Sequence, residues 1–91
     1  MILQLNEHTK INHYLCTPDI VIYFLNSKET TLLTSYMALI YICLLQNVEK
    51  PIADNQLFSL CNLKENDQSI ELQYNESLDK LIQLKLIESI E

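Results

Sequence analysis

The stretch SLDKLIQLKLIESIE (residues 77–91) decides how the fold is read, because a helical pattern gives way to a strand within it. Together with the residues before it, it places Ile70, Tyr74, Leu78 and Leu81 three or four positions apart, the spacing of one buried face of a helix. The last six residues, LIESIE, predict a closing strand. We therefore expect a long helix that ends shortly before a C-terminal strand.

Two further helices are expected before this one. The segment SKETTLLTSYMALIYICLLQN predicts a helix over residues 27–47 that Ser27 caps. Residues 37–45 are apolar nearly all round, so this helix should be the most buried element. Farther along, KPI (residues 50–52) predicts a short extended segment, followed by a helix that is capped near Asp54 and ends around residue 62.

The N-terminal part carries conflicting signals. Residues 2–5, ILQL, predict a short strand, and residues 6–16 read as a polar connection. The sequence TPD at residues 17–19 is typical of a helix start, with a cap, a first-turn proline and an acid near the positive end of the helix. The β-branched residues 20–22 favour a strand instead. We expect a short helix here.

The composition indicates one small acidic domain. The chain has 91 residues, of which 48% are hydrophobic and none is glycine, so we expect a single domain (residues 1–91) with one core. Six lysines stand against twelve acids, the net charge is −6, and arginine is absent. Because the planar fork of arginine is the usual bidentate ligand of phosphate and guanine, the chain is a poor candidate for an extensive contact with a duplex.

The cysteines and histidines form no pattern that is typical of chemistry. Cys16, Cys43 and Cys61 are far apart, which favours free thiols at core positions in a reducing, cytoplasmic compartment. His13 and Cys16 are too unspecific a pair to predict a catalytic dyad, and with His8 they lack the fourth ligand of structural zinc. The longest apolar run has nine residues, too few to span a membrane. We expect no enzyme activity, no cofactor, no metal and no membrane contact.

Residues 28–91 resemble the winged helix-turn-helix family. Asn62 lies where the turn after the family's second helix usually has glycine, and LKLI (residues 84–87) resembles the family's leucine-x-glycine-leucine-isoleucine ending with Lys85 in place of glycine. The apolar positions that match the second helix, its turn and the inward face of the recognition helix are Leu57, Leu60, Cys61, Leu63, Tyr74, Leu78 and Leu81.

This resemblance implies a mainly α fold with a compact three-helix core and a minimal two-stranded β element. Residues 1–27 would add an N-terminal strand and a short helix, and residues 28–91 would form the helix-turn-helix-like core. The chain departs from the family in stopping after one wing strand, so the partner of that strand is expected to be either residues 2–5 or a strand of another subunit.

The charges also depart from the family, whose third helix presents basic and polar side chains to the major groove. From residue 57 to the end there are seven acids and three lysines, whereas residues 1–56 hold five acids and three lysines. The half that should contact DNA is the more acidic half. Carboxylates near phosphates repel them, so direct nucleic-acid binding is not expected. The acids in and just before the third helix are Glu65, Asp67, Glu71, Glu76 and Asp79.

These observations favour a non-enzymatic protein-binding module. We expect the five acids Glu65, Asp67, Glu71, Glu76 and Asp79 to bind a protein with a basic surface, such as a nucleic-acid-handling protein. In size and charge the chain is similar to small acidic phage inhibitors such as anti-CRISPR proteins. The five acids also fit a simpler role, a solvated helix face that keeps the protein in solution. The alternative is a DNA-binding transcription regulator or replication-initiator domain. It requires a homodimer that gathers Lys50, Lys64, Lys80 and Lys85 on one face.

Overall fold

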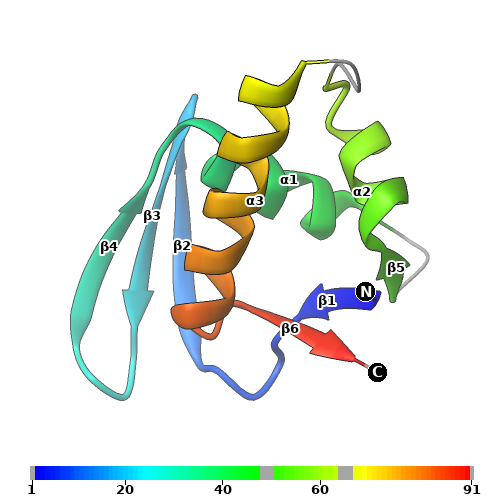
Figure 1. The fold of residues 1–91 in the computed structure, drawn as a ribbon. Coiled ribbons are helices and arrows are strands. Elements are labelled where there is room, and N and C mark those ends of the chain that lie inside the picture. The colour runs from blue at the N-terminus through cyan, green and yellow to red at the C-terminus, as the bar shows by residue number, and fades with distance from the viewer. Residues whose placement is uncertain (1, 48–50, 64–66, 91) are drawn as a thin grey trace.

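Three helices and two small antiparallel sheets build the fold in the computed structural model, which describes residues 2–47, 51–63 and 67–90 (Figure 1). Strands hold 33% of these residues and helices 42%, so the expected mainly α fold is wrong and the fold is α+β. In chain order the elements are β1 (Ile2–Leu5), β2 (Ile11–Cys16), β3 (Asp19–Phe24), β4 (Glu29–Leu33), α1 (Ser35–Gln46), β5 (Ile52–Ala53), α2 (Asp54–Leu60), α3 (Gln68–Gln83) and β6 (Ile87–Ile90).

The strands β2, β3 and β4 form a three-stranded meander where a polar connection and a short helix were expected. Ile20 and Ile22 of β3 are fully buried while Val21 between them is half-buried, which is the two-residue period of a strand. The helix-start signal belongs instead to the turn between β2 and β3, where the Thr17–Pro18 peptide bond is cis. The β-branched residues therefore outweighed the capping signal, because alternate side chains of β3 are buried in the core.

The helix α1 begins later than predicted but is the central element. Residues 29–33, expected in its first turns, pair with β3 as the strand β4. From Ser35 onward the helix contacts α2, α3, β1 and β3, which confirms that its nearly uniform apolar surface is covered on several sides. Among the described residues, none of the helices combines the length and apolarity that a bilayer crossing requires. The buried side chains of α1 are Ala38, Ile40, Tyr41 and Leu44.

The N-terminal strand completes the second sheet. β1 lies between β5 and β6, and its register with β6 runs from Ile2 opposite Ile90 to Leu5 opposite Ile87 (Figure 1). Side chains reinforce this pairing, because Gln4 Nε2 donates a hydrogen bond to Glu88 Oε1. Of the two partners considered for the closing strand, residues 2–5 therefore provide it. The expected two-stranded element is a three-stranded sheet.

The helix α3 confirms the predicted apolar spacing, whereas in α2 Leu57 is buried but Leu60 is 51% exposed. Tyr74, Leu78 and Leu81 of α3 are all buried, as their three- and four-residue intervals predicted. The ring of Tyr74 packs edge-on against Phe58 of α2 with centroids 4.9 Å apart. Its hydroxyl donates to the main-chain carbonyl oxygen of Asp54 at 3.4 Å. Burial, with the nearby charge of Asp54, raises the pKa of Tyr74, so the neutral phenol is the form that joins α3 to α2.

Four of the described residues adopt the left-handed backbone that glycine favours, although the chain contains no glycine, and two of them end helices α2 and α3. Asn62 has φ 57° after α2 and Lys85 has φ 63° after α3, at the two positions where the family resemblance has glycine. The Leu86 and Lys85 amides donate to the carbonyl oxygens of Leu81 and Ile82, closing the end of α3 as a Schellman motif. Lys85 therefore occupies a conformation that disfavours a side chain with a Cβ.

The packing of α3 is tested by one substitution at two positions. Leu78 is 2% exposed and Leu72 is 60% exposed on the same helix, so Leu78→Ala removes buried surface and Leu72→Ala does not. We expect Leu78→Ala to lower the free energy of unfolding by about 3 kcal/mol and Leu72→Ala to change it by less than about 0.5 kcal/mol. Urea denaturation measures both, and equal losses would mean that the register of α3 is wrong.

The left-handed residue after α3 gives a second prediction. Lys85→Gly should raise the free energy of unfolding by about 0.5–1 kcal/mol, because glycine adopts this backbone without a Cβ clash. Lys80→Gly removes the same side chain inside the helix and should lower stability by about 1 kcal/mol. The two variants are compared by urea denaturation. A loss of stability in Lys85→Gly would contradict the cost assigned to the left-handed lysine.

Candidate functional site

The outer face of α3 carries three of the carboxylates that the sequence assigned to partner binding. Glu71, Glu76 and Asp79 are exposed, on the side of the helix away from its buried residues. Because an α-helix turns about 100° per residue, the three spread over roughly 140° of this face. Lys80 follows Glu76 by one turn and is the single lysine of the helix, so carboxylates dominate the surface. We call Glu71, Leu72, Glu76 and Asp79 the acidic face.

Leu72 lies in the middle of the acidic face, although the sequence predicted only acids as partner-binding residues. Its side chain is 60% exposed, and it precedes Glu76 by four residues and Asp79 by seven, which places all three on one side of the helix. The sequence signal that could have identified Leu72 is its position in the helical period. It falls outside the three- and four-residue spacing of the buried Tyr74 and Leu78, so a helix over these residues places it on the exposed side. The acidic face therefore combines an apolar centre with a charged surround.

The other two acids assigned to partner binding have different positions. Asp67 is the N-cap of α3, where its Oδ1 accepts hydrogen bonds from the amides of Ser69 at 3.0 Å and Ile70 at 3.4 Å. Its carboxylate thus has a structural task at the positive end of the helix. Glu65 lies outside the described residues.

Of the four lysines required by the alternative DNA-binding function, the structure describes two. Lys80 is on the helix and Lys85 is in the turn after it, whereas Lys50 and Lys64 lie outside the described residues. Glu76 stands one turn before Lys80 and offsets its charge for any approaching phosphate. The described part of this surface therefore suits a basic partner better than a nucleic acid.

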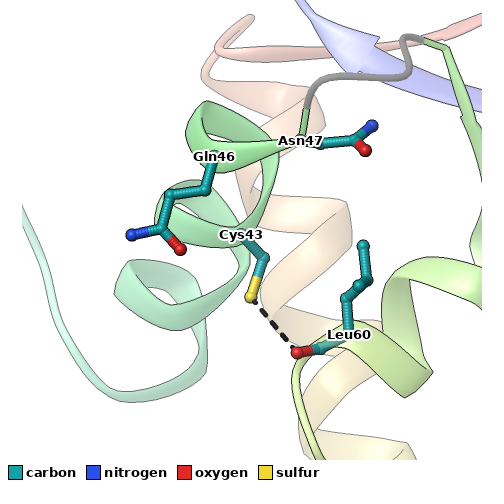
Figure 2. Close-up of a pocket in the computed structure, with 4 residues that line it drawn as sticks. All are labelled: Cys43, Gln46, Asn47 and Leu60. Atoms are coloured by element: carbon teal, nitrogen blue, oxygen red, sulfur yellow. Dashed lines mark hydrogen bonds between the residues drawn. The ribbon is translucent and has the colours of Figure 1, made fainter.

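A second feature is a pocket between α1 and α2 of about 310 Å³, whose described lining is Cys43, Gln46, Asn47 and Leu60 (Figure 2). The thiol of Cys43 points at the main-chain carbonyl oxygen of Leu60, 3.9 Å away (Figure 2). Behind it the Sγ of Cys61 donates to the Sγ of Cys43 at 3.3 Å. Among the described lining residues only Cys43 is ionisable, so the pocket shows no paired acid and base for catalysis.

The histidine and cysteine of β2 are not brought together. His13 and Cys16 are three residues apart on one strand, so their side chains point to opposite faces of the sheet. The ring of His13 instead meets Tyr41 of α1 edge-on, with centroids 5.9 Å apart. Within the described residues, no group of three or more histidine, cysteine or acidic side chains is arranged to hold a metal ion.

Comparison with known proteins adds no assignment. The sequence matches no protein-family model, and searches of curated proteins and of solved structures find no similar protein. The function of the chain is therefore inferred from the surfaces that the structure describes, in particular the acidic face and the pocket at Cys43.

The capping role of Asp67 and the partner binding predicted for it are separable by substitution. Asp67→Ala removes the cap and should lower the free energy of unfolding by about 1 kcal/mol, whereas Asp67→Asn keeps an oxygen acceptor and should retain most of that stability. If Asp67 only caps α3, Asp67→Asn will also leave partner binding unchanged. Urea denaturation of the two variants decides the first point. Equal destabilisation would show that the charge, and not the hydrogen bonds, holds the start of α3.

Proposed function

We propose that this chain is a non-enzymatic protein-binding module that docks the acidic face of α3 on a basic surface of another protein. The observation that carries the proposal is Leu72, 60% exposed among exposed Glu71, Glu76 and Asp79. An exposed leucine can supply apolar contact area on docking, and the carboxylates around it steer a positively charged partner and fix its orientation. Together they form a small patch with an apolar centre and a charged rim, the arrangement of an interface.

The partner class follows from the charges. Lysine- and arginine-rich protein surfaces occur where proteins bind phosphates, so the carboxylates of the acidic face would occupy sites that otherwise take a nucleic-acid backbone. A nucleic-acid-handling protein is the partner that fits this chemistry. The chain would then act as a small acidic inhibitor or adaptor, as the likeness in size and charge to phage inhibitors such as anti-CRISPR proteins implies.

The proposal is tested with two triple variants that change charge equally. Glu71→Gln, Glu76→Gln and Asp79→Asn remove the acidic face, whereas Glu7→Gln, Asp19→Asn and Glu29→Gln remove the same residue types elsewhere. The probe is a fluorescently labelled arginine-rich peptide, and its affinity is measured by anisotropy at low and physiological salt. We expect the α3 triple to lose about tenfold or more in affinity, and the control triple to lose markedly less.

Two more measurements define the outcome. Leu72→Ala, which leaves the charge unchanged, should weaken binding several-fold, and its urea midpoint should match that of the unmodified chain. Equal losses in the two triple variants would mean that only net charge attracts the peptide, and the proposal would be rejected. A labelled DNA duplex and a labelled RNA are tested in parallel. Binding of either that falls steeply with salt would favour the DNA-binding regulator instead.

A further inference from the structure

Two cysteines from different helical segments meet in the core beside the pocket. Cys43 is on α1 and Cys61 follows the last residue of α2, eighteen positions later. Their sulfur atoms are 3.3 Å apart as free thiols. A disulfide bond needs about 2.05 Å, so the two sulfurs have to approach by only about 1 Å to become covalently linked.

The two thiols differ in accessibility. Cys43 is half-buried and lines the pocket of about 310 Å³ together with Gln46, Asn47 and Leu60 (Figure 2). Cys61 is 6% exposed and lies behind it. A small solute in the pocket therefore reaches the sulfur of Cys43 before that of Cys61.

We propose that Cys43 and Cys61 form a thiol–disulfide exchange site that takes a low-molecular-weight disulfide such as oxidised glutathione. In the first step the Cys43 thiol loses its proton, and its sulfur attacks one sulfur of the small disulfide. The small disulfide bond breaks, one small thiol leaves with the proton, and Cys43 holds the other half as a mixed disulfide. In the second step the sulfur of Cys61 attacks Cys43 Sγ and releases the second small thiol. The protein loses two hydrogens and the small disulfide gains them.

The protonation of Cys61 agrees with this order. Burial, and after it the hydrogen bond and charge of Cys43, raises the pKa of the Cys61 thiol. Cys61 therefore stays protonated in the reduced protein and is not the first nucleophile, because the thiolate is the reactive form. The second step requires removal of that proton, so it should become faster as the pH rises.

The bond would have a structural consequence that does not depend on the proposed function. It would join α1 to the C-terminal end of α2, and the closed loop would restrict the unfolded chain. The oxidised protein should therefore unfold at a temperature several degrees higher than the reduced protein.

To test this, the full chain carrying Cys16→Ser is incubated with oxidised glutathione. Cys16 is replaced because it is exposed and would react on its own. Mass spectrometry of the intact protein should show the loss of two hydrogens. Cleavage after glutamate separates Cys43 (residues 30–49) from Cys61 (residues 50–65), so the bond appears as one joined peptide that a reductant separates.

Single variants test the order of the steps. Cys61→Ser, or Cys61→Ala if serine prevents folding, should accumulate a glutathione adduct on Cys43. Cys43→Ser should leave Cys61 unmodified, and far-UV circular dichroism checks that each variant is folded. The proposal is overturned if Cys43 and Cys61 both remain thiols while the Cys16 of the unmodified chain reacts. An adduct on Cys61 in Cys43→Ser would overturn the assignment of Cys43 as the first nucleophile.

Discussion

The rest of the structure depends on the antiparallel pairing of β1 with β6, which joins the two ends of the chain. Gln4 of β1 and Glu88 of β6 are 84 positions apart, and they hold one another through a side-chain hydrogen bond beside the main-chain ladder. Without β1, the backbone groups of β6 on that side would lose their ladder partners. Because β6 follows α3 through the tight turn at Lys85, fixing β6 also fixes how α3 lies on the core.

The parts of the fold that the sequence predicted are those set by local spacing. Tyr74, Leu78 and Leu81 define the buried side of α3 whatever the rest of the chain does, and Asn62 marks a turn because of its own backbone preference. The meander was missed because its signals are non-local. β2 has hardly any buried residue to produce an alternating pattern, and the helix-start signal before Ile20 competes with the pairing of β3 to both neighbours.

In the candidate sites, too, features set by local spacing were predictable and features set by non-local contacts were not. The carboxylates Glu71, Glu76 and Asp79 were predicted from the charge of the segment, since exposed acids on a helix follow directly from its apolar period. The contact between Cys43 and Cys61 was not predictable, because a spacing of eighteen residues has no meaning until α1 and α2 are packed together. As single cysteines among apolar residues, they have the sequence signature of ordinary core positions.

A solvated helix face and a docking face differ in what they expose besides charge. Carboxylates keep an apolar chain in solution, but a leucine at the centre of the same face adds nothing to solubility and little to folding. Leu15 and Leu32 on the edge strands β2 and β4 are also exposed, and so is Leu60 on α2. What distinguishes Leu72 is its surround, because its position around the helix lies between those of the exposed Asp79 and Glu76. Its exposure within the acidic face therefore favours docking over simple solvation.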